Sequence, residues 1–449
     1  MADGRFESGA GEALAPSRLI DAGGWSRHQK WLVAIVACAL LFDGLDNQAL
    51  SQALPLLVAE WDVTRGDFAM AMTLGLVGMA LGTAGGGILG DRIGRKPVLV
   101  ASVISFGLFT CALALAGSVG QVSLLKLLAG FGLGGAVPNA VTFISEVTPA
   151  RRRSLAVIAA ALCVGVGGLV GGIGAAWILP AFGWQALFLA VGVPPLLLGL
   201  VLSALLPESP VWLVGRRGGG ARIALFMARS GQRLPPDQAF RRAAAGPTRT
   251  GSLAALFERD VRSDTIALWA AYWLTLFCLY ALVSWLPAVF SQAGFGLSIT
   301  STALAAFNLG GISGSLAAAW AIPRFGSARP LTGMALLGTA GAGAFSALSL
   351  APGGGVTLAM LLVVTMGISI GGLQVALYTL GIRLYDDANR ATGLGWAVGF
   401  GRSGAIVSPL VASAMLALAG STGLFLSIAL AMAGCASALL IIRRHVPAN

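Results

Sequence analysis

Long apolar segments recur along the whole sequence, and each is long enough to cross a lipid bilayer as a helix. Such a helix needs about 20 consecutive apolar residues. The segments of this length cover residues 31–54, 68–89, 97–117, 120–146, 154–178, 184–206, 264–291, 299–322, 330–350, 356–382, 391–418 and 421–442. Only 10% of the 449 residues are charged, whereas a soluble protein carries about 25%. We therefore expect an all-α polytopic membrane protein with twelve transmembrane helices.

Lysine and arginine are distributed very unevenly between the connections. Of the 29 residues of these two types, 26 fall in the tails and in the connections that share a side with the N-terminus, while Arg65 alone falls on the other side. Positive residues mark cytoplasmic loops. We therefore expect a multi-pass protein of the inner cell membrane with both termini in the cytoplasm. The net charge of +11 is then explained by topology, without a nucleic-acid partner.

The longest connection separates two halves that repeat each other. The matches at an offset of 232 are Leu54-Pro55 with Leu286-Pro287, Gly78 and Gly82 with Gly310 and Gly314, and Arg92 with Arg324; at 237 they are Gly134-Gly135 with Gly371-Gly372 and Arg153 with Arg390. Parallel repeats of this kind are typical of transporters with a central site between the halves. The expected divisions are a cytoplasmic tail (1–30), a six-helix half (31–206), a basic cytoplasmic linker (207–263), a second six-helix half (264–442) and a cytoplasmic tail (443–449).

Two carboxylates interrupt the first apolar segment. Asp43 and Asp46 are three residues apart, so a helix presents them on roughly one face. A charge at membrane depth costs a few kcal/mol on insertion scales, and it persists where it faces a cavity, a partner or a proton path. These two residues therefore indicate a functional site inside the membrane.

The connection between the second and third segments carries charges around a glycine. It reads Gly90-Asp91-Arg92-Ile93-Gly94-Arg95-Lys96. Gly94 permits a tight turn, and Asp91 can pair with basic residues of neighbouring helices. Glu146, at the inner end of the fourth segment, is the expected partner of this basic cluster. We expect these residues and Arg390 to form a gating latch, the alternative being a plain turn whose charges only set topology.

This loop, the twelve segments and the repeat together resemble the major facilitator superfamily over essentially the whole chain. The resemblance implies two six-helix bundles that rock to give alternating access, and a loop motif that stabilises the outward-facing state. The second-half copy of the motif is degraded, with Pro323 in place of the aspartate and Ser327 after the glycine. Any latch should therefore rest on the first half.

Within that superfamily the sequence looks most like the aromatic acid:proton symporters and the 3-hydroxyphenylpropionate transporters. The segments that carry this resemblance are Asp43-Gly44-Leu45-Asp46, residues 130–139, Arg390-Ala391-Thr392-Gly393, Gly401-Arg402-Ser403-Gly404 and Ser284-Trp285-Leu286-Pro287. One departure is Lys126, where the family pattern leads us to expect arginine. Lysine offers a point charge rather than a planar fork. The resemblance implies import of an aromatic carboxylic acid, of the hydroxybenzoate or hydroxyphenylpropionate type, with protons.

The charged residues inside the apolar segments then receive roles in proton coupling and substrate binding. Asp46 is the first candidate for the proton carrier, coupled to Asp43, and Lys126 is expected to pair with Asp46 when it is ionised. Arg402 is assigned to the substrate carboxylate, because arginine binds carboxylates through two parallel hydrogen bonds. The alternatives are structural hydrogen bonds or ion pairs for Asp43, Asp46 and Arg402, and snorkelling of Lys126 to the outer interface.

Uncharged polar and aromatic residues complete the expected substrate site. Gln374 and Tyr378 are one helical turn apart and could bond a ring hydroxyl. The other candidates for the cavity wall are Asn139, Asn308, Tyr280 and Trp285, each with ordinary packing as the alternative.

Other functions fit the sequence less well. A proton-coupled exporter of drugs or metabolites usually has a Gly-Pro pair in the fifth helix, which residues 165–174 lack. A sugar-type proton symporter would share the aspartate but would not need Arg402. We expect no enzyme activity, no cofactor other than the coupling proton and no metal, because the sequence shows no nucleotide loop, metal cluster or catalytic dyad. The expected partners are the aromatic carboxylate, protons and the lipid bilayer, and we expect a monomer.

Overall fold

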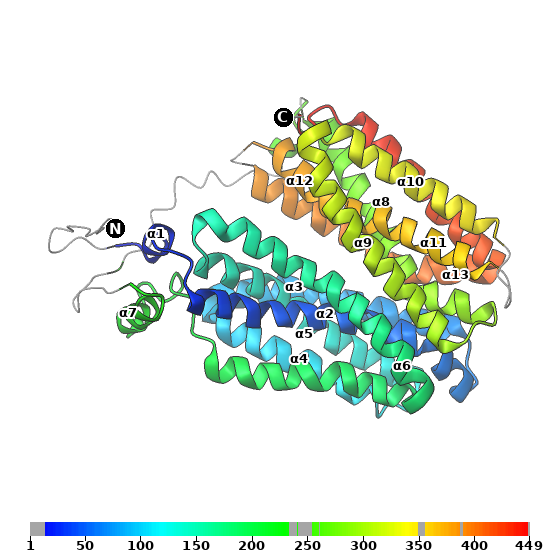
Figure 1. Cartoon of the computed structure of the whole chain (residues 1–449), viewed down its shortest axis with the longest axis horizontal. Helices are drawn as coiled ribbons and strands as arrows, with labels where there is room; N and C mark the ends of the chain where they lie inside the picture. The colour runs from blue at the N-terminus through cyan, green and yellow to red at the C-terminus, as the bar shows by residue number, and fades with distance from the viewer. Residues whose placement is uncertain are drawn as a thin grey trace.

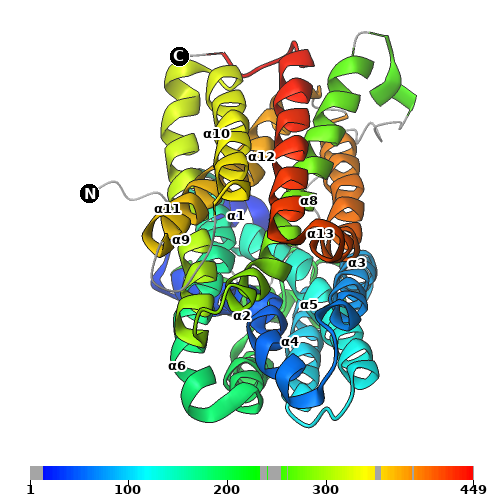
Figure 2. The same cartoon turned by 90° about the vertical axis from the view of Figure 1, so that its right-hand side faces the viewer.

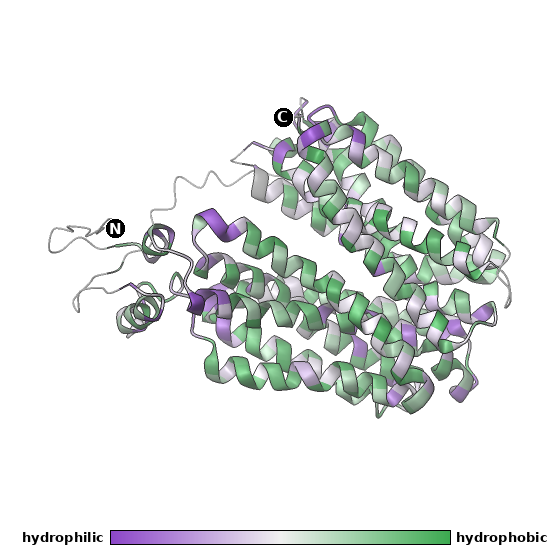
Figure 3. Cartoon of the chain, in the orientation of Figure 1, coloured by the Kyte–Doolittle hydropathy of each residue, from purple (hydrophilic) through white to green (hydrophobic). Residues whose placement is uncertain are grey.

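The computed structural model describes residues 14–232, 240, 254–259, 261–348, 355–386 and 389–447. The start of the predicted N-terminal tail, most of the linker between residues 233 and 253, and the side chain of Arg390 lie outside the described part. Within the described residues every regular element is helical, and nine helices are long and apolar enough to cross a membrane. In Figure 3, apolar residues predominate along the length of these helices.

The first half is a bundle of long helices. They are α2 (Arg27–Trp61), α3 (Phe68–Ile93), α4 (Arg95–Leu113), α5 (Val119–Val147) and α6 (Ala150–Leu205), with the short η1 (Arg65–Asp67) before α3. The backbone of α6 breaks at Gly183, where φ is +77°. This single element therefore contains two membrane-crossing helices, and the first half has six.

The second half repeats this arrangement. Its helices are α8 (Arg262–Gln292), α9 (Leu297–Phe325), α10 (Ala328–Ser346), α11 (Val356–Met366), the π-helical η3 (Gly367–Gly371), α12 (Gly372–Leu384) and α13 (Arg390–Ile441). α11, η3 and α12 form one continuous span, and α13 breaks at Ala419 and Gly420. With the 19-residue α10, the second half also has six helices, and the prediction of twelve is confirmed.

Close packing of α3 on α5 explains two glycines of the first half. A Cβ atom at Gly78 would collide with the carbonyl oxygen of Leu127, and one at Gly82 would collide with that of Phe131. Only glycine allows the two backbones to approach so closely, which is the usual role of small residues between membrane helices.

The same contacts recur between α9 and the α11–η3 span. A Cβ atom at Gly310 would collide with the carbonyl oxygen of Val364, and one at Gly314 with that of Ile368. The α9 glycines follow their first-half counterparts by 232 residues, and the two carbonyl residues follow theirs by 237. The repeat seen in the sequence is therefore also a repeat of helix packing.

The two bundles converge at one end of the molecule and diverge at the other. We name the end with α1, α7 and both chain termini the terminal face, and the opposite end the distal face. In Figure 1 the bundles diverge toward the terminal face on the left, and the perpendicular view in Figure 2 separates the same two groups of helices. Ser298 Oγ of α9 donates to the carbonyl of Ala176 of α6 at 3.0 Å near the distal face.

From Leu14 onward, the described residues before the first span pack against the first half. α1 (Pro16–Ala22) buries Ile20, and α2 already begins at Arg27, where Ser26 and Gln29 form a capping box. Asp21 accepts hydrogen bonds from the backbone N–H of Ala150 and from Arg153. This segment is therefore docked on the start of α6. The linker also contains helices, α7 (Gly219–Arg229) and η2 (Ala254–Phe257).

Candidate functional site

A cavity of about 350 Å³ lies between the two halves. Its wall is mostly apolar, and its polar residues are Asp43, Asn47, Gln48, Tyr280, Asn308, Ser315, Gln374, Tyr378 and Arg402. A predominantly apolar pocket with a few convergent polar groups is the usual form of a small-molecule site. Lining residues such as Ala161, Ser315 and Tyr378 lie toward the terminal face along their helices, so the cavity extends to the side on which the bundles diverge.

Asp43 enters this cavity from α2. Its side chain is only 4% exposed, and Oδ1 has no hydrogen-bond partner among the described residues. The neighbouring Gly44 touches α6, because a Cβ atom there would collide with the carbonyl oxygen of Val164. The Asp-Gly pair therefore has a physical basis, since the glycine allows the close helix contact and the aspartate lies beside it in the cavity wall.

Asp46, one turn further along α2, is fully partnered. Its Oδ2 lies 3.2 Å from Nζ of Lys126, and its Oδ1 accepts a hydrogen bond of 2.5 Å from Oγ1 of Thr110. Lys126 is 7% exposed, so its ammonium group points into the bundle and does not reach the outer interface. Thr110 lies in an apolar segment with no distinctive pattern, and the sequence analysis did not single it out. The two aspartates therefore have different environments.

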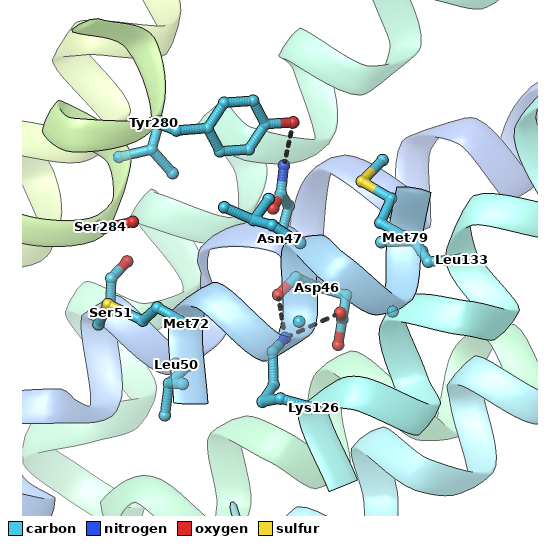
Figure 4. A pocket seen from close by; sticks show the side chains of 14 residues that line it. Asp46, Asn47, Leu50, Ser51, Met72, Met79, Lys126, Leu133, Tyr280 and Ser284 are labelled. Carbon is cyan, nitrogen blue, oxygen red and sulfur yellow. Dashed lines mark hydrogen bonds and ion pairs between the residues drawn. The ribbon is translucent and has the colours of Figure 1, made fainter. Parts of the chain in front are cut away.

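The Asp46–Lys126 pair lines a separate cavity of about 40 Å³ beside the central one. Figure 4 shows the ammonium group of Lys126 directed at Asp46, with Asn47 and Tyr280 above them. Asn47 and Tyr280 line both cavities, and Asn47 Nδ2 donates to the Tyr280 hydroxyl at 3.5 Å. These two residues therefore separate the ion pair from the central cavity.

Arg402 is the cation of the central cavity. It comes from α13 and forms no ion pair with any described residue. It lines the same cavity as Asp43, Tyr280 and Tyr378. An unpaired guanidinium in an apolar wall is suited to bind an anion, because its five N–H donors match a carboxylate in two-pronged geometry.

The structure brings together four of the six uncharged residues that the sequence suggested for substrate binding. Tyr280, Asn308, Gln374 and Tyr378 all line the central cavity. Asn308 exchanges two hydrogen bonds with Gln48, which the sequence analysis did not single out. Tyr378 packs edge-on against Tyr272, with ring centroids 5.8 Å apart.

The other two candidates lie elsewhere. Trp285 is 1% exposed, does not line the cavity and donates from Nε1 to the carbonyl oxygen of Pro409 at 3.0 Å. Asn139 donates to the carbonyl oxygens of Gly86 and Gly135, both at 2.9 Å, and so joins α5 to α3. Both residues are parts of helix packing, and the prediction that they line the cavity is wrong.

The charged turn at the terminal face forms a compact network within the first half. Arg95 lies 2.6 Å from Asp91 and 3.6 Å from Glu146. Asp91 of α3 therefore pairs, as expected, with a basic residue of a neighbouring helix, because Arg95 is the first residue of α4 across the Gly94 turn. Arg92 takes part through its carbonyl oxygen, which accepts from Arg216 at 3.2 Å.

Glu208, at the start of the linker, holds the same turn from the other side. Its Oε1 accepts from the backbone N–H groups of Arg95 and Lys96 at 2.9 and 3.1 Å, and the hydroxyl of the adjacent Ser209 donates to Glu146. Gly90 packs against Asn139, whose Oδ1 a Cβ atom at this position would displace.

In the second half, the turn at Ser327 is tied to the C-terminal segment by hydrogen bonds with His445 and Val446 rather than by ion pairs.

The repeated six-helix bundles, with a central cavity lined by Asp43 and Arg402, define a membrane transporter. The chain belongs to the Major Facilitator Superfamily, whose sequence model matches residues 36–409. The chain is 36% identical over 413 residues to the 4-hydroxybenzoate transporter PcaK of Pseudomonas aeruginosa, covering 91% of this chain and 90% of that protein. It is 33% identical to the 3-(3-hydroxy-phenyl)propionate transporter of Escherichia coli, covering 93% and 96%.

A solved structure shares the fold. The crystal structure of a bacterial homologue of the human lysosomal transporter Spinster aligns with a TM-score of 0.69, at 16% identity, covering 93% of this chain and 97% of that one.

Proposed function

We propose that this transporter imports an aromatic carboxylic acid, of the hydroxybenzoate or hydroxyphenylpropionate type, together with protons. The observation that carries the proposal is Arg402, whose guanidinium lies in a mostly apolar cavity between the halves and forms no ion pair with a described residue. The apolar wall accepts an aromatic ring, and Arg402 binds the carboxylate. The relatives named above support this substrate class, because they are transporters of hydroxylated aromatic acids at 36% and 33% identity.

Proton coupling follows from the charge balance of the cavity. Arg402 and ionised Asp43 together carry no net charge, so a bound carboxylate would leave one negative charge uncompensated in an apolar site. A proton on Asp43 removes that charge and leaves Arg402 free for the substrate. Substrate and proton therefore favour each other's binding, which is the thermodynamic requirement for symport.

The contacts favour Asp43 over Asp46 as the proton carrier, although the sequence analysis put Asp46 first. A proton on Asp46 would leave the buried ammonium of Lys126 without its partner, and an unpaired buried charge costs several kcal/mol. Asp43 has an unsatisfied carboxylate oxygen in a cavity that a proton can reach. We assign the Asp46–Lys126 pair to holding α2 against α5.

The transport direction rests on the orientation of the chain. We place the terminal face in the cytoplasm, because most of the lysines and arginines in the connections lie on that side. The bundles diverge toward this face, so the described conformation is inward-facing and releases substrate to the cytoplasm. Rocking of the halves would expose the same cavity to the other side.

The test is uptake of labelled 4-hydroxybenzoate by liposomes that contain the purified protein. Uptake is expected only with an inward proton gradient, and a protonophore should abolish accumulation. Excess unlabelled aromatic acid should compete, whereas a pentose or a cationic drug should not. Absence of uptake for every aromatic acid, or accumulation that survives the protonophore, would overturn the proposal.

A further inference from the structure

Gln374 has an unused amide in the wall of the central cavity. It lies on α12, and its Oε1 is shielded from solvent without a hydrogen-bond partner among the described residues. Buried polar groups are nearly always hydrogen-bonded, and each exception requires an explanation. Here the explanation is a bound ligand with a hydrogen-bond donor, which would be the partner of Oε1.

The neighbouring amides of the cavity are already engaged. Gln48 and Asn308 bond each other at 3.0 and 2.9 Å, and Asn47 donates to Tyr280. Gln374 is therefore the amide of this cavity wall that is free to bind substrate, within the part of the chain that the structure describes.

The position of Gln374 is fixed by tight packing. It follows the π-helical turn η3 by three residues, and π-helical turns are frequent at functional sites. At the end of that turn, a Cβ atom on Gly371 would come within 2.8 Å of the Cα atom of Gly311 on α9. Such contact leaves α12 little room to shift or rotate, so the backbone that carries Gln374 is held in place.

The internal repeat shows that this polarity is specific to the second half. At the offset of 237, the first-half counterpart of Gln374 is Val137, which also lines the cavity. The counterpart of Arg402 is Gly165, another lining residue. The polar groups for the substrate therefore come from the second half, while the matching positions of the first half present apolar surface.

Arg402 and Gln374 together predict two functional groups of the substrate, a carboxylate and a hydrogen-bond donor. Gln374, Arg402 and Tyr378, which is one turn from Gln374, all line the central cavity, so the guanidinium and the amide face one compartment. We propose that Gln374 forms a subsite for a hydroxyl group on the substrate ring, which makes the transporter selective for hydroxylated over unsubstituted aromatic acids. This proposal rests on the proposed function, because it requires the carboxylate to bind at Arg402.

A phenolic hydroxyl suits this subsite because it both donates and accepts, as an amide does. It can donate to Oε1 while it accepts from Nε2. A site built to hydrogen-bond a hydroxyl discriminates strongly against the analogue that lacks it, since the polar group of the site is then left unpaired. A methoxy group accepts but does not donate, so it leaves Oε1 unpaired and should bind more weakly than a hydroxyl.

The test compares uptake of labelled 4-hydroxybenzoate, 3-hydroxybenzoate, 4-methoxybenzoate and benzoate by the reconstituted protein and by Gln374→Met. The wild type should transport at least one hydroxybenzoate with kcat/KM roughly tenfold or more above benzoate and the methoxy compound. Gln374→Met should remove that preference by lowering kcat/KM for the hydroxybenzoate toward the value for benzoate. Val137→Met, at the matching position of the first half, is the control and should retain the preference.

The possible failures are distinguishable. If no aromatic acid is transported, the proposed function fails; if benzoate and both hydroxybenzoates are transported equally by the wild type, only the hydroxyl subsite fails. An unchanged preference in Gln374→Met would also overturn the subsite. Gln374→Asn, which keeps the amide on a shorter chain, provides a second variant if Gln374→Met does not fold, and it should retain more of the preference than Gln374→Ala.

Discussion

Gln48 of α2 and Asn308 of α9 join the two halves through reciprocal hydrogen bonds of their side-chain amides, 3.0 and 2.9 Å long. The pair fits against α6, because a Cβ atom at Gly168 would approach both amides within 2.5 Å. The cavity lies on the terminal side of this pair, and Ser298 bonds Ala176 on the distal side. An outward-facing state requires these contacts to separate.

A cross-link near the distal face should therefore stop transport. A Cβ atom at Gly66 of η1 would lie 3.5 Å from Oγ of Ser413 on α13, which is close to the spacing a disulfide needs. Oxidised Gly66→Cys/Ser413→Cys should lose uptake, and a reducing agent should restore it. The two single variants cannot form this cross-link, so they control for any effect of oxidation on the native cysteines. Full uptake by the cross-linked protein would contradict alternating access about this interface.

Replacement of Arg402 should weaken substrate binding. A hydrogen bond to a charged group is worth about 1.5–3 kcal/mol, so Arg402→Gln should raise KM for 4-hydroxybenzoate roughly 10- to 100-fold. Arg402→Lys keeps the charge but loses the two-pronged geometry, and should be intermediate. The control is Arg324→Lys. In the wild type, the guanidinium carbon of Arg324 lies 4.3 Å from the ring centroid of the exposed Trp320. Equal KM values for the wild type and Arg402→Gln would remove Arg402 from the site.

Asp43→Asn should separate substrate movement from proton movement. The asparagine mimics the neutral, protonated side chain, so exchange of labelled for unlabelled substrate should continue while accumulation against a gradient is lost. Wild-type uptake should fall as the external pH rises, because fewer Asp43 side chains take up a proton, and the variant should lose this dependence. Uptake assays at several pH values check both points. Proton-driven accumulation by Asp43→Asn would exclude Asp43 as the carrier.

Asp46 and Lys126 should behave as a structural pair. Asp46→Asn or Lys126→Met alone leaves an uncompensated buried charge and should cost about 3–5 kcal/mol of unfolding free energy. The double variant should lose less unfolding free energy than the sum of the two single losses, because both single variants remove the same interaction. Thermal unfolding in detergent measures this, with the exposed Lys30→Met as control. Strict additivity would show that the pair contributes no coupling.

The repeated glycine contacts predict parallel effects in the two halves. Gly82→Ala and Gly314→Ala each place a methyl group against a carbonyl oxygen of the adjacent helix, so both should destabilise the protein by about 1–3 kcal/mol, as overpacking does. Gly87→Ala, which has open space around its Cβ position, should be neutral or slightly stabilising, since alanine favours helix. Thermal unfolding of the three variants tests whether the packing repeats as the sequence does.

The number of helices, their repeat and the placement of Asp43, Lys126 and Arg402 inside the bundle could be derived from the sequence. These follow from hydropathy and from the high cost of a charge in a membrane, both of which are local properties of the chain. Tyr280 and Trp285 mark the limit of that reasoning. They lie on the same helix, yet one lines the cavity and the other packs against α13. α8 is apolar on every side, so its sequence pattern does not reveal which face meets the cavity.

Partners that are distant in sequence were harder to predict. Thr110 bonds Asp46 from a segment with no distinctive pattern, and Glu208 supports the charged turn from 113 residues away. Asn139 looked like a cavity residue because it is polar at membrane depth, but its amide satisfies two backbone carbonyls of tightly packed helices. Such contacts depend on the rotation of each helix, which the three-dimensional packing determines.

The distal position of the contacts between the halves has an electrical consequence. An open vestibule filled with water conducts ions, so the voltage across the membrane would fall mainly over the closed distal part of the bundle. Asp43 lies at the inner border of that part. When the halves rock, the closed part changes side, and a proton held on Asp43 would then pass through most of the voltage, a gain of ~2.3 kcal/mol for each 100 mV. With the terminal face in the cytoplasm, the membrane voltage by itself would favour the inward movement of that proton, before any difference in pH contributes.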